Sequence, residues 1–201
     1  MNYLAHAYLS FSIPEIVVGN LISDFVKGKK KLDYPESIQK GIVLHRAIDT
    51  FTDEHEVTRQ AKTFFRPDYG LYAGALTDVV YDHFLANDSQ AFPGGLAAFA
   101  ENTYEQLAPF QPLFPEKFAR MWPYMRSQNW LYNYRTQEGI FHSFAGLSRR
   151  AAYMPSPEKA CQVFETCYKE LEACYSLFFP ELAAFASTTL QQLLEGYGKI
   201  E

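Results

Sequence analysis

Two helix-spaced pairs of ionisable residues are the most informative feature of this chain. His45 and Asp49 are four residues apart, and Asp78 and Asp82 repeat that spacing. Residues four apart project from one face of a helix, a turn from each other. Imidazole and carboxylate groups on facing helices can bind a divalent cation such as Mn²⁺, Fe²⁺, Zn²⁺ or Mg²⁺. The spacing therefore predicts a metal site inside a helical bundle.

Three further ionisable residues accompany these pairs. Asp24 interrupts an apolar stretch, His83 directly follows the second pair, and His6 lies near the N-terminus. A buried carboxylate is costly unless a cation neutralises it or a proton binds it. If these helix faces are buried, the residues require a cation.

A structural explanation exists for each of these residues taken singly. A histidine on an apolar helix face, such as His45, is commonly a hydrogen-bonded core residue, and Asp49 could pair with a nearby arginine. Asp78 and Asp82 could form the solvated side of their helix. Only the whole set favours a metal site. His55 and His142 lack such companions, and we assign both to structure.

The hydrophobic pattern indicates which elements must position these side chains. Apolar residues recur with a period of about 3.6 residues and almost nowhere with a period of two. Prolines and glycines separate the periodic segments. We expect helices near 13–27, 35–51, 54–65, 69–86, 95–108, 115–127, 137–151, 157–178 and 181–197. The sequence thus predicts one all-α domain over residues 1–201, a bundle of about eight to ten helices.

Composition narrows the class of protein. The chain has 201 residues, 48% of them hydrophobic, and a net charge of −5, which excludes a disordered chain and argues against nucleic-acid binding. We expect no membrane insertion and a cytoplasmic protein, because no signal peptide and no run of about 18 apolar residues is present. Cys161, Cys167 and Cys174 are expected to be reduced packing residues. The aromatic content of 16% leaves monomer and homodimer open.

Four segments resemble the acyl carrier protein phosphodiesterase family. They are 1–6 (MNYLAH), 19–28 (GNLISDFVKG), 41–49 (GIVLHRAID) and 78–85 (DVVYDHFL), with weaker matches at 130–135 and 148–150. The resemblance implies an all-α fold like that of HD phosphohydrolases. It also implies an enzyme that uses a divalent cation, typically Mn²⁺, to cleave the phosphodiester between 4′-phosphopantetheine and a serine of holo-acyl carrier protein.

The matching motifs imply a metal and catalytic set in this chain. The expected metal ligands are His6, Asp24, His45, Asp49, Asp78, Asp82 and His83. Asp24, Asp49 and His83 are also expected to act in catalysis, together with Arg46, whose guanidinium suits a phosphate oxygen. The broad HD pattern has His followed directly by Asp, whereas here Arg46 follows the histidine. Ligands therefore cannot be separated from acid and base by motif alone.

Basic residues are expected to receive the substrate. Acyl carrier proteins are acidic, so docking on this acidic chain needs a local basic patch. The candidate substrate-binding residues are Lys27, Lys29, Lys30, Arg149 and Arg150. Two alternatives stay open: a related phosphohydrolase of nucleotides or other small phosphodiesters, and a helical binding module without catalysis.

Overall fold

The computed structural model describes residues 1–151 and 153–196, and every regular element within them is helical. The α-helices are α1 (Tyr3–Tyr8), α2 (Pro14–Ile22), α3 (Glu36–Glu54), α4 (Glu56–Tyr69), α5 (Ala73–Asn87), α6 (Leu96–Leu107), α7 (Glu116–Ser127), α8 (Trp130–Asn133), α9 (Gln137–Arg150), α10 (Pro157–Thr166) and α11 (Tyr168–Gly196). Four short 3₁₀ helices join them: η1 (Ser23–Phe25), η2 (Gly28–Asp33), η3 (Gly70–Tyr72) and η4 (Ala108–Leu113). The all-α prediction is confirmed, with eleven α-helices in these ranges rather than eight to ten. The single domain over 1–201 stays a prediction.

The helix predicted over 13–27 is shorter than expected. α2 ends at Ile22, and the chain continues through η1 into an extended residue, Val26, before Gly28 turns it with a φ of +56°. A helix propagates only while each residue adds a hydrogen bond, and the η1 turn replaces the α-helical pattern here. The change of direction exposes Asp24 instead of burying it within a helix.

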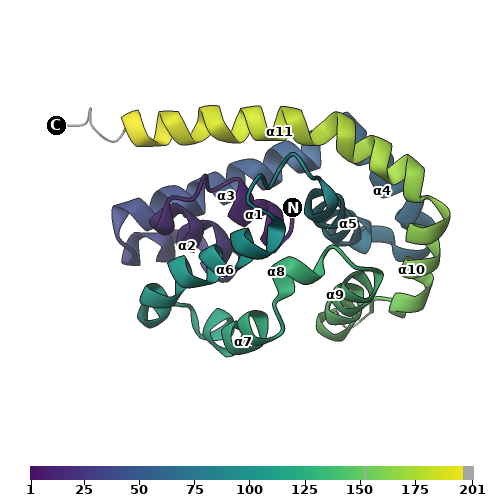
Figure 1. The fold of residues 1–201 in the computed structure, drawn as a ribbon, viewed down its shortest axis with the longest axis horizontal. Coiled ribbons are helices and arrows are strands. Elements are labelled where there is room, and N and C mark those ends of the chain that lie inside the picture. The colour runs from purple at the N-terminus through teal and green to yellow at the C-terminus, as the bar shows by residue number, and fades with distance from the viewer. Residues whose placement is uncertain (152, 197–201) are drawn as a thin grey trace.

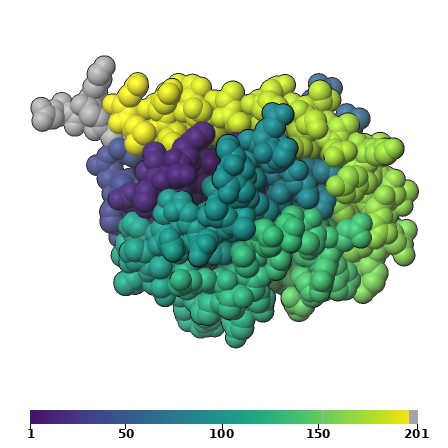
Figure 2. Space-filling model, viewed as in Figure 1, coloured from purple at the N-terminus to yellow at the C-terminus, as the bar shows by residue number. Residues whose placement is uncertain are grey.

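The C-terminal helices also divide differently from the prediction. The break falls at Cys167, and α11 continues through Pro180, which was expected to separate two helices. An internal proline removes one helical hydrogen bond, but buried side chains on both sides, including Phe178 and Leu182, anchor the helix to the core. In Figure 1, α11 therefore runs along one whole side of the molecule. Figure 2 shows its yellow surface bordering the purple N-terminal segment.

Within residues 1–151 and 153–196, every helix, α11 included, is too short or too polar to cross a membrane.

The three cysteines are unpaired, with Cys161 on α10, Cys167 at its end and Cys174 on α11.

The central helix of the fold is α5. It packs against α1, α4, α9 and α11 (Figure 1), and its residues from Val79 to Ala86 are all buried. A helix that is buried on all sides loses the usual polar face. Asp82 and His83 lie within this buried stretch, so these two polar side chains must find partners inside the protein.

Two glycines bring α2 and α3 unusually close together. A Cβ atom on Gly19 would collide with the carbonyl oxygen of Ile38, and one on Gly41 would lie 2.5 Å from the carbonyl oxygen of Ile16. Helix backbones can approach this closely only where side chains are absent. The end of α2, and with it Asp24, is thereby held against α3.

Candidate metal and catalytic site

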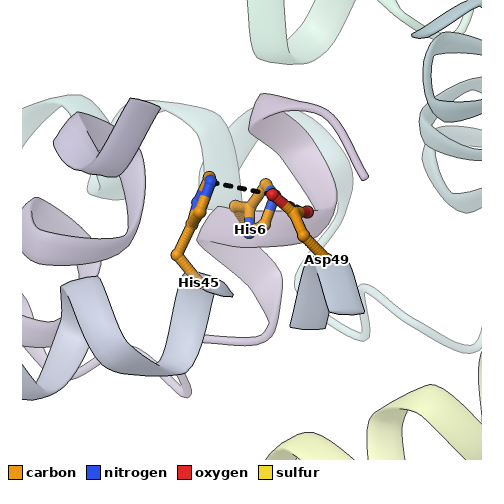
Figure 3. A group of neighbouring side chains, drawn as sticks. All are labelled: His6, His45 and Asp49. Atoms are coloured by element: carbon orange, nitrogen blue, oxygen red, sulfur yellow. Dashed lines mark ion pairs between the residues drawn. The ribbon is translucent and has the colours of Figure 1, made fainter. Parts of the chain in front are cut away.

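His6 on α1 meets His45 and Asp49 on α3 (Figure 3). Nε2 of His45 lies 3.0 Å from Oδ2 of Asp49, and Nε2 of His6 lies 3.2 Å from Oδ1 of the same carboxylate. The two imidazole rings are stacked, with centroids 3.9 Å apart and planes inclined by 18°. One potential ligand atom from each residue lies within 4.8 Å of the others. We call these three residues the His–Asp cluster.

Buried nitrogen atoms show that this cluster suits an ion. Nδ1 of His6 and Nδ1 of His45 are buried, and the described residues provide no hydrogen-bond partner for them, whereas the buried Nε2 of His6 contacts Oδ1 of Asp49. Buried polar atoms normally have a partner, so two such atoms on stacked histidines require an explanation. A cation coordinated by imidazole nitrogen and carboxylate oxygen would supply it, and this donor set suits first-row divalent metals. The residues present therefore fit a divalent cation.

Asp24 forms the solvent-facing side of the His–Asp cluster. Its Oδ1 accepts a hydrogen bond from Nε2 of His45 at 3.2 Å, and 68% of its side chain is exposed. Asp49 is less exposed, at 38%. His45 thus lies between two carboxylates, one of which faces water and is accessible to a substrate.

The two histidines have opposite pKa shifts when no cation is bound. Burial and the neighbouring His45 lower the pKa of His6 to about 4. Burial also acts to lower the pKa of His45, but its contacts with Asp24 and Asp49 outweigh that effect and raise the pKa to about 9. The charge of a protonated His45 thus offsets part of the negative charge of the two carboxylates in the metal-free protein.

The amino group of Met1 connects Asp78 to the His–Asp cluster. Its nitrogen lies 3.1 Å from Oδ1 of Asp78 and 3.4 Å from Oδ1 of Asp49. Burial raises the pKa of the Asp78 carboxyl, although the Met1 ammonium opposes that shift. Asp78 is thus linked to the two histidines through the Met1 amino group and Asp49.

Asp82 binds backbone atoms of the N-terminal segment. Its buried carboxylate accepts hydrogen bonds from the N–H groups of Asn2 at 3.3 Å, Leu4 at 2.7 Å and Ala5 at 3.2 Å. These N–H groups belong to the first turn of α1 or precede it, where a helix has no internal acceptors and favours negative charge. Burial raises the pKa of Asp82 to about 7 even though these donors act to lower it. Asp82 thus positions α1, which carries His6.

The imidazole of His83 lies on a different side of α5. Its Nδ1 donates to the carbonyl oxygen of Tyr134 at 2.8 Å, and its Nε2 accepts from the hydroxyl of Tyr168 at 3.1 Å. The ring also packs edge-on against Phe164. The structure therefore does not bring His83 to the His–Asp cluster but uses it to connect α5 with the chain before α9 and with α11.

The other two histidines occupy peripheral positions. Nε2 of His55 lies 3.3 Å from Oε2 of Glu181, and the ring packs against Phe178. His142 is exposed and lies one turn from Glu138 on α9. Both histidines thus contact exposed glutamates, away from the His–Asp cluster.

The comparisons with known proteins identify the family. A family model described as "Acyl carrier protein phosphodiesterase" matches residues 1–182. The chain belongs to the acyl carrier protein phosphodiesterase family. A relative of that name from Klebsiella pneumoniae subsp. pneumoniae is 33% identical over 188 residues, which cover 92% of this chain and 97% of the relative. Another, from Yersinia pestis, is 32% identical over 184 residues, 90% and 95% of the two chains. No solved structure was found to match.

Membership in the acyl carrier protein phosphodiesterase family confirms the resemblance inferred from the motifs, and with it the hydrolase class. The segments that carry Asp24, the His–Asp cluster and Asp82 all lie within the matched residues. The expected likeness to HD phosphohydrolases stays a prediction.

Arg46 binds a backbone carbonyl group in this protein. Its Nη2 donates to the carbonyl oxygen of Val26 at 2.9 Å, which ties α3 to the segment between η1 and η2. The side chain is otherwise exposed, and it neighbours His45 in sequence. Arg46 can therefore fix the segment after Asp24 whether or not it also binds phosphate.

The basic residues predicted to receive the substrate are exposed. Lys27, Lys29 and Lys30 lie at or within η2, and Arg149 and Arg150 end α9.

The phenol of Tyr3 interacts with both Arg150 and Asp24. Burial raises the pKa of Tyr3 to about 12, with the charge of Arg150 opposing this shift and that of Asp24 adding to it. Arg150 and Asp24 are therefore both within electrostatic range of Tyr3, although 126 positions separate them in sequence.

A groove of about 680 Å³ opens beside Asp24, and sequence reasoning identified only one of its walls. The first wall is the stretch from Asp24 to Tyr34, and the second comes from the end of η4 and the start of α7. Its lining residues are Asp24, Phe25, Val26, Lys27, Lys30, Asp33, Tyr34, Pro112, Leu113, Pro115, Glu116 and Lys117. The prolines near 109–115 indicate a break between helices, but no local pattern shows which distant segment that break will face. We call this hollow the Asp24 groove.

Proposed function

We propose that this protein hydrolyses the phosphodiester between 4′-phosphopantetheine and a serine of holo-acyl carrier protein, with apo-acyl carrier protein and 4′-phosphopantetheine as products. The observation that carries the proposal is the group formed by His6, His45 and Asp49, in which the buried Nδ1 atoms of both histidines have no partner in the described chain. The name shared by the relatives supports the choice of substrate. The proposal retains the cytoplasmic location predicted from the sequence.

The His–Asp cluster would hold a divalent cation, with Asp24 as a further ligand or neighbour at the exposed side. Mn²⁺ is our first choice, and Mg²⁺, Fe²⁺ and Zn²⁺ have compatible chemistry with this donor set. A cation bound there supplies two things: a lower pKa for a water molecule and neutralisation of the phosphodiester oxygens.

Asp24 is the carboxylate best placed to handle the proton of the attacking water. Its side chain is exposed, and Oδ1 is already in hydrogen-bond contact with His45. Water oxygen bonds to phosphorus, the bond from phosphorus to the serine oxygen breaks, and Asp24 Oδ1 accepts the proton of the water. The departing serine oxygen, on the opposite side of the phosphorus, takes its proton from solvent water. His83 has no part in this step, because its two nitrogens bind Tyr134 and Tyr168.

The carrier protein would approach across the exposed basic residues. Lys27, Lys29 and Lys30 lie next to Asp24 in the chain, and Arg150 interacts electrostatically with Tyr3, as Asp24 does. An acidic partner is steered by such local positive charge even where the whole molecule is acidic. We therefore propose that these lysines and Arg149 with Arg150 face the carrier protein.

Intact-mass spectrometry of holo-acyl carrier protein tests the proposal. We expect conversion to the apo mass with Mn²⁺ present and none with excess chelator. Asp24→Asn and His45→Ala should abolish the conversion while the far-ultraviolet circular dichroism stays that of wild type, and His142→Ala is the matched control. Failure of the wild type to convert the carrier in the presence of bound metal would contradict the proposal. Cleavage of bis(4-nitrophenyl) phosphate alone would then favour a small phosphodiester as the substrate.

A further inference from the structure

We propose that the Asp24 groove binds the pantetheine arm of the substrate, the neutral chain of alkyl and amide groups that leads away from the phosphate. This inference rests on the proposed function, because the arm is a substituent of the phosphorus atom that the site would attack. The carrier protein itself would lie over the opening of the groove, on exposed lysines of which Lys27 and Lys30 also line it.

The charge of the groove lining matches an uncharged occupant. Within the described chain, the lining includes three carboxylates and three ammonium groups: Asp24, Asp33, Glu116, Lys27, Lys30 and Lys117. The remaining residues are apolar or aromatic: Phe25, Val26, Tyr34, Pro112, Leu113 and Pro115. An acidic protein segment would require an excess of positive charge, which this lining does not have. An arm of alkyl groups and amides matches apolar walls with a few polar groups.

The position of the groove suits one substituent of a phosphodiester. Asp24 belongs both to the groove lining and, through its contact with His45, to the candidate catalytic site. A phosphorus atom at the His–Asp cluster could therefore place its small substituent in the groove. A volume of about 680 Å³ lies within the range of roughly 300–1,000 Å³ found for small-molecule sites.

Contacts behind the lining keep the two walls of the groove in place. The ring of Phe25 packs against Phe118 on α7 with centroids 5.7 Å apart, and Phe118 packs edge-on against Phe114 at 4.8 Å. The guanidinium of Arg46 holds the carbonyl oxygen of Val26 at 2.9 Å. A groove fixed in this way loses little conformational entropy when a flexible arm binds.

Titration calorimetry with Mn²⁺-loaded protein tests the inference without relying on turnover. The probes are 4′-phosphopantetheine and inorganic phosphate, which share the phosphate group and differ in the arm. We expect 4′-phosphopantetheine to bind about tenfold more tightly or better, because apolar groove contacts give differences of this order. Leu113→Glu should remove most of that preference, since it places a charge on the apolar wall. Leu71→Glu, at a fully exposed leucine on η3, is the matched control.

The possible results test the groove inference and the proposed reaction separately. Equal affinity of the wild type for the two probes would overturn the groove inference, as would equal effects of the two glutamate variants. Leu113 is 38% exposed, so a folded variant is expected, and Leu113→Asn provides a milder second variant. A wild type that binds 4′-phosphopantetheine preferentially but leaves holo-acyl carrier protein intact would support the groove and overturn the proposed function. Hydrolysis of the carrier without a preference for 4′-phosphopantetheine would support the proposed function and overturn the groove inference.

Discussion

The carboxylate of Asp82 accepts a hydrogen bond from the backbone N–H of Leu4 at 2.7 Å, although 78 positions separate the two residues in sequence. The same carboxylate also accepts from Asn2 and Ala5. One side chain of the central helix α5 thus sets the position of α1. Since α1 carries His6, the effect of Asp82 on the candidate site is exerted through the backbone.

Asp82→Asn should destabilise the protein. The amide group cannot accept from all three N–H donors, and its own NH₂ faces them, so we expect a loss of about 2–3 kcal/mol in the free energy of unfolding. Urea denaturation measures this, with the exposed Glu105→Gln on α6 as control. We also expect weaker Mn²⁺ binding, because α1 loosens around His6. Equal stability of the two variants would show that α1 does not depend on this carboxylate.

Metal removal should lower the melting temperature. An ion that binds only the folded state and is present at about 100 times its Kd adds about 2.7 kcal/mol to the stability. For a chain of this length that corresponds to a change in Tm of roughly 5–10 °C. Scanning calorimetry of the protein with Mn²⁺ and after dialysis against chelator provides the comparison. Superimposable transitions would argue for a helical protein that binds no metal.

His6→Ala should lower the affinity for Mn²⁺ at least about tenfold, since it removes one of the three residues of the His–Asp cluster. Metal analysis after gel filtration measures the stoichiometry, and His142→Ala controls for the loss of any histidine. His45→Ala is expected to behave like His6→Ala. If the His6→Ala protein kept the metal content of the control, α1 would not contribute a ligand.

His83→Phe should affect stability rather than metal binding. The variant leaves the carbonyl of Tyr134 and the hydroxyl of Tyr168 without the imidazole, so we expect a loss of about 2 kcal/mol at pH 8 and wild-type metal content. Loss of bound metal with unchanged stability would instead make His83 a ligand.

Acid sensitivity gives a second measurement on His83→Phe. Burial lowers the pKa of His83 below its ordinary value of 6.5. As the pH falls below that value, the unfolded chain binds a proton that the folded chain resists, so stability present above pH 6.5 is lost on acidification. The fall in Tm between pH 8 and pH 5 should therefore be smaller in His83→Phe than in the wild type.

Lys29→Ala combined with Lys30→Ala should raise the KM for holo-acyl carrier protein and weaken its dependence on salt. Exposed charges act over about 10 Å at 0.1 M salt, so added salt should affect the wild type more than the variant. Kinetics at two ionic strengths measures both effects, and Lys169→Ala on α11 is the control. A KM that does not respond to salt in the wild type would show that the η2 lysines do not steer the carrier.

The accuracy of the sequence-based predictions depended on whether the relevant geometry was local. His45 and Asp49 lie one turn apart on a continuous helix, so their spacing predicted their juxtaposition correctly. Asp82 and His83 are adjacent in sequence, but successive helical residues point about 100° apart. Asp82 therefore binds the backbone of α1, whereas His83 binds Tyr134 and Tyr168. A sequence motif cannot show that the two side chains have different partners.

Long-range packing explains what the sequence could not predict. His6 reaches α3 because α1 docks against α2 and α5, and α1 is too short for its own periodicity to indicate a helix. The Asp24 groove depends on η4 and α7 facing η1, which no local pattern indicates. The helical class of the fold, by contrast, follows directly from the hydrophobic period and was predicted correctly.

Gly19 and Gly41 have no functional group, yet they set the distance across which Asp24 contacts His45. A single added methyl group at either position would force α2 and α3 apart. Mutational tolerance in this protein should therefore not follow chemical function alone. A survey of random substitutions should find these two glycines among the most sensitive positions. A designer who wishes to widen the site would substitute one of them first.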